Sequence, residues 1–144
     1  MRLAATQPWN DTGQGISSVI PMKVAEANDG HVVLLAKADA RHTNPLGAVH
    51  GGFAATVLDG ATGCAVHTTL PAGVGYGTID FSIKMMRPVP QNEELKAVGK
   101  VLNKSRSLVV AEAVLTDPSG KMYAHATSTC MITPAANAEG TDPS

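Results

Sequence analysis

Hydrophobic and polar residues alternate most regularly between residues 78 and 85. Apolar side chains occupy the odd positions from Ile79 to Met85, and polar or charged side chains occupy the even positions from Thr78 to Lys84. A period of two is typical of a β-strand that buries one face, so the pattern places Thr78 and Ile79 on opposite faces. Pro88 follows, and because proline cannot donate to a ladder, the strand is predicted to end before it.

Five further apolar runs are bounded by residues that favour turns. They lie at residues 22–27, 31–38, 95–102, 108–115 and 122–132. Asn28-Asp29-Gly30 separates the first two and is typical of a hairpin turn. Asp117-Pro118-Ser119-Gly120 separates the last two and has proline at the second position of a β-turn. We therefore predict five more strands.

Residues 52–70 lack this alternation and are rich in alanine, which predicts a helix of about five turns. The segment is uncharged almost all round, which is typical of a helix buried on most sides. Gly73-Val74-Gly75-Tyr76-Gly77 follows the helix instead of preceding one, so we interpret it as a flexible loop and not as a nucleotide-binding loop.

The predicted order is two strands, one helix and four strands. With one helix available, alternating βαβ units do not fit, whereas an antiparallel sheet wrapped around a central helix does, so the predicted class is α+β. We expect residues 16–133 to form one domain. Residues 1–15 are a polar N-terminal lead-in, and residues 134–144 have no periodicity and are predicted to be a flexible C-terminal tail.

The composition argues against several classes of function. The net charge is −1 and aromatic residues make up 3% of the chain, so neither a basic surface nor a stacking platform for nucleic acid is expected. No apolar run approaches the length of about 18 residues that a membrane span needs, and no signal peptide is recognisable. Cys64 and Cys130 are interpreted as buried free thiols, and we expect a reducing, cytoplasmic location.

The segment between Thr43 and Ile79 contains one charged residue, Asp59. At the average of 16% charged residues, the span would hold about six. A carboxylate is expensive to remove from water unless it is paired or hydrogen-bonded. Asp59 is therefore either paired with a group that the sequence does not reveal or kept for chemistry. Nine residues before it stands His50, followed by two glycines, where a helix is expected to begin.

These residues resemble a known family. Asn44-Pro45-Leu46-Gly47-Ala48-Val49-His50-Gly51-Gly52, Asp59 seven residues later, and Met86-Arg87-Pro88-Val89 are similar to the PaaI-like hot-dog-fold acyl-CoA thioesterases. The resemblance runs from about residue 16 to residue 132. It implies a hot-dog fold, homodimers that often form homotetramers, and hydrolysis of acyl-CoA thioesters with neither a metal nor an organic cofactor. The acyl group, aryl or medium-chain, is left open.

The resemblance also suggests roles for individual residues. It implies that Asp59 is the catalytic carboxylate, acting as a nucleophile or as a base for water, and that Asn44 contacts the thioester or the attacking water. Thr78 lies near a position where some members have a hydroxyl that positions water. The free N–H groups of a helix N-terminus can polarise a carbonyl, which favours Gly51 as oxyanion donor and His50 as an orienting or polarising group.

The spacing adds a constraint of its own. Asp59 lies eight residues past Gly51, which is about 12 Å along one helix. That is too far for both residues to act on one carbonyl, so the spacing predicts a dimer with each site shared between two subunits. Small residues are expected to let two helices approach each other, and these are Gly60, Ala61, Gly63 and Cys64.

Coenzyme A carries phosphates, so cations are expected at the mouth of the site. The candidates for binding its phosphates are Arg87, Lys104, Arg106 and Ser107. The histidines lack metal-ligand spacing, so no metal site is predicted. A Gly-x-Ser-x-Gly elbow is absent from the sequence, which disfavours a serine hydrolase.

Two alternatives remain open at the level of sequence. One is an acyl-CoA hydratase or dehydratase on the same fold, which would need an acid and a base close together. The other is a non-enzymatic acyl-CoA-binding module, which would gain nothing from keeping a carboxylate at residue 59.

Overall fold

The computed structural model describes residues 15–134, so most of the predicted lead-in and tail lies outside the described residues. The elements are η1 (Ile16–Ser18), β1 (Met22–Asn28), β2 (His31–Lys37), η2 (Ala40–His42), α2 (Gly51–His67), β3 (Gly75–Met85), β4 (Glu94–Lys104), β5 (Leu108–Thr116) and β6 (Met122–Thr133). The predicted order of six strands and one long helix is confirmed. The prediction of a loop at residues 73–77 is wrong for its second half, because β3 already begins at Gly75.

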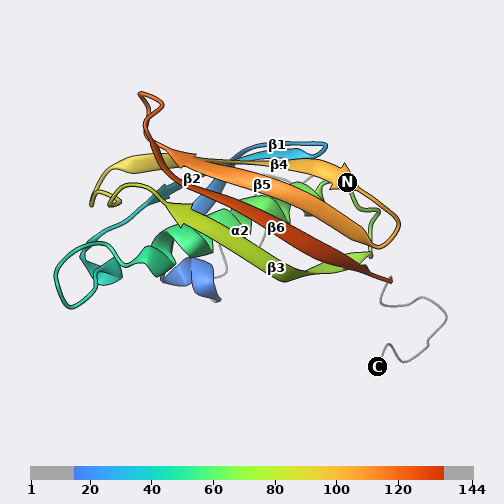
Figure 1. Ribbon diagram of the computed structural model, residues 1–144, viewed down its shortest axis with the longest axis horizontal. Helices are drawn as coiled ribbons and strands as arrows, with labels where there is room; N and C mark the ends of the chain where they lie inside the picture. Colours follow the sequence, from blue (N-terminus) through green and yellow to red (C-terminus); the bar gives the residue numbers. More distant parts are fainter. Residues whose placement is uncertain (1–14, 135–144) are drawn as a thin grey trace.

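The six strands form one antiparallel sheet in the order β1-β2-β4-β5-β6-β3. The sheet curves around α2, which lies along its concave face (Figure 1). This is the predicted α+β architecture of a sheet wrapped around a central helix. The two edges of the sheet are β1 and β3, and β3 is the longer, with 11 residues against 7.

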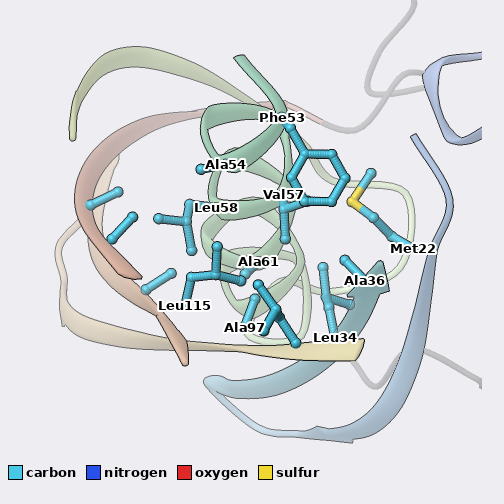
Figure 2. Close-up of a cluster of buried hydrophobic side chains, with 14 of the residues drawn as sticks. Met22, Leu34, Ala36, Phe53, Ala54, Val57, Leu58, Ala61, Ala97 and Leu115 are labelled. Atoms are coloured by element: carbon cyan, nitrogen blue, oxygen red, sulfur yellow. The ribbon is translucent and has the colours of Figure 1, made fainter. Parts of the chain in front are cut away.

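The hydrophobic core fills the space between α2 and the sheet. Phe53, Val57, Leu58 and Ala61 of the helix lie in the same cluster as residues of several strands, as Figure 2 shows for Leu34, Ala97 and Leu115. Burial on all these sides explains why the helix sequence has no polar stripe.

The helix approaches the sheet closely at Gly99 of β4. A Cβ at residue 99 would lie 2.3 Å from the carbonyl oxygen of Ala61, so only glycine fits there. Ala61 is fully buried and faces the sheet. The expectation that Ala61 belongs to a small face for a second helix is therefore wrong.

A β-bulge interrupts β3 next to a predicted site residue. Thr78 is paired with Cys130 and Asp80 with Thr129, so Ile79 is the extra residue of the bulge. Ile79 is 56% exposed, whereas the Thr78 side chain reaches the helix. The predicted alternation holds from Phe81 onward but fails before it, because one extra residue reverses which positions face inward.

Both cysteines are free and buried, as predicted. Within residues 15–134, no helix is long and apolar enough to cross a membrane. The same part of the chain has no group of three or more His, Cys, Asp and Glu side chains that could hold a metal ion.

Candidate active site

His50 caps the N-terminus of α2. Its backbone is extended, and its Nδ1 accepts a hydrogen bond from the Gly52 N–H at 2.7 Å. Because Nδ1 is the acceptor, Nε2 carries the hydrogen in the neutral ring and can donate. The His50 backbone N–H donates to the carbonyl oxygen of His42 at 2.7 Å, which fixes the chain just before the helix. His50 is thus held in place while its ring remains exposed.

Gly51 is the first residue of the helix, where N–H groups have no intrahelical acceptor. Within residues 15–134, the Gly51 N–H donates to no other group, whereas the N–H groups of Gly52 and Phe53 are bonded to His50. Met85 packs directly against Gly51, since a Cβ at residue 51 would lie 2.8 Å from the Met85 sulfur. The helix therefore offers one free amide at its positive end.

Asn44 shapes the loop that leads to the helix. Its side-chain Oδ1 accepts hydrogen bonds from the N–H groups of Leu46 at 3.0 Å and Ala48 at 3.2 Å. Its backbone N–H donates to the Ala48 carbonyl at 2.7 Å. The side-chain oxygen thus has a structural role in this loop, and a contact of Asn44 with substrate stays a prediction.

A cavity of about 340 Å³ opens at this end of α2. His50 and Gly51 line it together with Met85, the last residue of β3, and with Met86 and Arg87, which follow the strand. We call it the amide cavity. Arg87 is the one predicted coenzyme A-binding cation that lies beside the predicted oxyanion donors.

Asp59 lies on the exposed side of α2 and contacts the edge strand. The Thr78 hydroxyl donates to Asp59 Oδ1 at 3.2 Å, and it also lies 3.7 Å from the sulfur of Cys130. Asp59 is exposed in the single chain, so the carboxylate is both solvated and hydrogen-bonded. Thr78 is therefore the hydrogen-bond partner of Asp59 that the sequence did not reveal.

Asp59 and Thr78 line a second, larger cavity of about 710 Å³ between α2, β3 and η1. We call it the carboxylate cavity. Its wall includes Gly60, Gly63 and Cys64 of the helix and Tyr76 of β3. His50 and Gly51 are absent from its lining. The structure therefore brings Asp59 to Thr78 and His50 to Gly51, and within one chain it keeps the two pairs in separate cavities.

The other residues predicted to bind the phosphates of coenzyme A lie at the opposite end of the molecule. Lys104, Arg106 and Ser107 belong to the β4–β5 connection, beside the start of β3 and the end of α2. The Lys104 ammonium donates to the Thr69 carbonyl at 2.6 Å, just past the helix C-terminus, where a cation is favoured by the helix dipole. In one subunit they do not join Arg87.

Sequence reasoning assigned no role in binding or catalysis to three lining residues of the carboxylate cavity, Cys64, His67 and Tyr76. Burial raises the pKa of the Cys64 thiol to about 12 and raises the pKa of Tyr76 above its ordinary value. Burial lowers the pKa of His67. Tyr76 was hidden inside a glycine-rich stretch, and the helical spacing of residues 59, 63 and 67 was the signal that could have linked His67 to Asp59.

Comparison with known proteins gives concordant matches. The model of the thioesterase superfamily matches residues 46–124. A putative esterase of Halobacterium salinarum is 34% identical over 110 residues, which are 73% of this chain and 72% of that protein. Acyl-coenzyme A thioesterase 13 of Mus musculus is 33% identical over 89 residues, which are 61% of this chain and 63% of the mouse protein.

The fold is also similar to that of solved structures. A hypothetical thioesterase from Streptococcus pneumoniae, crystallised with coenzyme A, superposes with a TM-score of 0.73 and 25% sequence identity. The match covers 79% of this chain and 90% of the S. pneumoniae chain.

Proposed function

The chain belongs to the thioesterase superfamily and is a thioester hydrolase with the hot-dog fold, and from this premise we propose that it hydrolyses acyl-CoA thioesters at sites shared between two subunits. The observation that carries the proposal is the division of the site. The free amide lies in the amide cavity and the carboxylate lies in the carboxylate cavity, so each chain holds two halves that cannot meet within it. Membership of the PaaI-like branch, which the sequence resembles, is part of this proposal.

The edge strand β3 supports a homodimer. Within the described residues 15–134 it pairs only with β6, it is 11 residues long, and its Ile79 and Met85 are more than half exposed. A long, apolar edge with free N–H and C=O groups favours pairing with another strand. We propose that β3 pairs antiparallel with β3 of the partner.

The register of this pairing follows from the contacts of β3 with the helix. Thr78 contacts Asp59, and Met85 packs against Gly51. A two-fold axis near Phe81 would set Thr78 opposite the partner subunit's Met85. This register brings the carboxylate of one chain to the free amide of the other, and it leaves two equivalent sites in each dimer.

The proposed chemistry uses each half for one task. The Gly51 N–H and the His50 Nε2–H donate to the carbonyl oxygen, which gains negative charge as the carbon is attacked. In the water route, Asp59 takes a proton from water while the water oxygen bonds to the carbonyl carbon, and the carbon–sulfur bond then breaks to release the thiolate. Thr78 holds the carboxylate in its orientation.

A second route remains open. Asp59 can itself attack the carbonyl carbon, after which the carbon–sulfur bond breaks, the thiolate leaves and a mixed anhydride remains for water to hydrolyse. The two routes differ in where the oxygen of water ends up. A single turnover in labelled water leaves label in the Asp59 carboxylate only if Asp59 is the nucleophile.

The same β3–β3 pairing supports a role in phosphate binding for the residues predicted to bind coenzyme A. Lys104, Arg106 and Ser107 lie beside the start of β3, whereas Arg87 lies just past its end. Antiparallel β3 strands put the start of one beside the end of the other, so the partner's β4–β5 connection approaches Arg87. We propose these residues for the phosphates of coenzyme A, and we propose no further cofactor. Association of two dimers into a tetramer stays part of the proposal.

The two alternatives are less well supported. A hydratase needs an acid and a base close together, and His50 and Asp59 lie in different cavities of a chain. A pure binding module has no use for a carboxylate that Thr78 orients. Release of free thiol from an acyl-CoA panel distinguishes hydrolysis from both.

Mixed dimers test the shared site. Gly51→Pro removes the free amide hydrogen but suits the helix, because proline is favoured at the first helical position and the extended His50 backbone is compatible with a following proline. We expect Gly51→Pro and Asp59→Asn homodimers each to lose about a hundredfold in kcat. A mixed dimer of the two variants keeps one intact site and should recover up to half of the wild-type activity.

Gly51→Ala is the matched control, because it adds a Cβ at the same position but keeps the N–H. It should retain much more activity than Gly51→Pro. Mixed dimers that form, as mass spectrometry would verify, and yet remain inactive would contradict a site shared between subunits.

A further inference from the structure

The carboxylate cavity has a polar end that the proposed hydrolysis does not use. Tyr76 and His67 line it, with ring centroids 5.7 Å apart and planes inclined by 59°. Among residues 15–134, neither the Tyr76 hydroxyl nor the His67 ring nitrogens make a hydrogen bond. Both side chains are half-buried. Two polar groups without partners therefore lie in the cavity that holds Asp59.

The position of this end relative to Asp59 is set by the helix. A Cβ at residue 63 would lie 3.1 Å from the Tyr76 hydroxyl, so Gly63 makes room for that hydroxyl against α2. Residue 63 is one turn past Asp59, about 6 Å along the axis, and His67 is a second turn further. A group that starts at the thioester carbonyl beside Asp59 and follows this groove reaches Tyr76 and then His67.

The rest of the groove is apolar or neutral. Met22, Ala55 and Phe81 are among its lining residues, and within residues 15–134 Asp59 is the only Asp, Glu, Lys or Arg in the lining. Burial raises the pKa of Tyr76, which keeps its hydroxyl protonated, and burial lowers the pKa of His67, which keeps the ring neutral. Among residues 15–134, the lining of this end of the groove therefore offers hydrogen-bonding groups but no cationic side chain to an anionic group.

We propose that Tyr76 and His67 select acyl groups that have an apolar body and end in an uncharged oxygen, such as a hydroxyl or a carbonyl, and that they disfavour acyl groups ending in a carboxylate. The inference rests on the proposed function, because it takes the carbonyl to lie beside Asp59. The Tyr76 hydroxyl donates to or accepts from the terminal oxygen, and His67 lies one turn further to meet longer groups.

The selectivity arises because filling the groove decides whether the Tyr76 hydroxyl and the His67 ring have hydrogen-bond partners. A purely apolar acyl group displaces water and leaves the Tyr76 hydroxyl and the His67 ring without partners, which is unfavourable. A terminal hydroxyl restores the hydrogen bond, and sites built around such a bond discriminate strongly against analogues that lack it. A terminal carboxylate would be desolvated without a cationic side chain among the described lining residues to pair with.

The test compares acyl-CoA substrates of one length on the full chain. We would measure kcat/KM for hexanoyl-CoA, ω-hydroxyhexanoyl-CoA and adipoyl-CoA, and repeat the first pair with octanoyl and ω-hydroxyoctanoyl groups. For at least one length, we expect the hydroxylated substrate to be favoured by about tenfold. Among the three six-carbon substrates, adipoyl-CoA should have the lowest kcat/KM.

Tyr76→Phe should bring the ratio of hydroxylated to plain substrate to about one for the favoured length, because it removes only the hydroxyl. Tyr123→Phe is the matched control, since it removes the hydroxyl of the other tyrosine, which lies 3.5 Å from Asp117 and outside this groove. It should leave the ratio unchanged. Because each ratio is taken within one variant, a general loss of activity or stability cancels.

Three results would overturn the inference: a wild-type ratio of one or less at both lengths, a ratio that Tyr76→Phe leaves unchanged, or adipoyl-CoA hydrolysed as well as hexanoyl-CoA. Turnover of hexanoyl-CoA by Asp59→Asn shows whether only the proposed selectivity has failed or the proposed hydrolytic function as well. If that variant is inactive while the ratios fail, the hydrolytic site stands and only the selectivity is wrong. If it keeps wild-type turnover, the proposed function itself is wrong.

Discussion

The two halves of the candidate site are built in different ways. The half at the start of α2 comes from neighbouring residues and largely from main chain, with the His50 cap, the free Gly51 amide and the loop that Asn44 shapes. The half around Asp59 comes from side chains that are distant in sequence, since Thr78 donates to Asp59 across the gap between edge strand and helix. We therefore expect side-chain changes that keep the backbone to cost less activity in the first half than in the second.

The largest expected effect is that of Asp59→Asn. The change keeps the size of the side chain but removes the charge, and we expect kcat to fall by at least about a hundredfold. Because Asp59 is exposed in the single chain, the melting temperature of the variant should stay close to that of the wild type. Thiol release and thermal unfolding measure the two quantities.

Asp29→Asn is a control for the loss of one negative charge, because Asp29 lies in the exposed β1–β2 turn. It should keep wild-type turnover. Wild-type kcat in Asp59→Asn would remove Asp59 from the mechanism and with it the distinction between the two halves.

A smaller effect is expected for Thr78→Val, which keeps the shape but loses the hydroxyl that donates to Asp59. We expect kcat to fall about tenfold with little change in KM, because the carboxylate loses a positioning hydrogen bond. Thr78→Ser should restore most of the loss. Equal kcat for the valine and serine variants would show that the hydroxyl does not position Asp59.

The smallest effect is expected at His50, where the two halves differ most clearly. His50→Ala removes the N-cap and should lower the free energy of unfolding by about 1 kcal/mol. His50→Asn, a favoured cap, should restore that stability in a urea titration.

Neither variant keeps the imidazole donor, so both should show a severalfold lower kcat. Full activity in His50→Asn would mean that His50 serves only as a cap, and the first half of the site would then be main chain alone.

Local patterns in the sequence predicted the fold well and located the start of α2, where the first half of the candidate site lies. Strand alternation, the proline and glycine turns and the uncharged helix gave the correct order of elements, and His50 before two glycines marked the correct start of α2. These signals act within a few residues, where sequence spacing and spatial distance are closely related.

Long-range features were not predictable in the same way. The bulge at Ile79 depends on the pairing of β3 with β6, so alternation alone put Thr78 on the wrong face. The burial of Ala61 depends on Gly99, nearly forty positions later in the chain. Lys104 and Arg87 are far apart because of the order of the strands in the sheet. The positions of cationic residues in the sequence do not reveal that order.

The bulge at Ile79 changes which residues of β3 face the helix. Before it, even-numbered residues such as Tyr76 and Thr78 face the helix, and after it the odd-numbered residues Phe81 and Met85 do so. Tyr76 and Thr78, before the bulge, line the carboxylate cavity; after the bulge, Phe81 lines the same cavity and Met85 packs against the start of α2. A single extra residue thus lets one edge strand contact the helix on both sides of the bulge, at Asp59 and at Gly51, while Ile79 itself points outward.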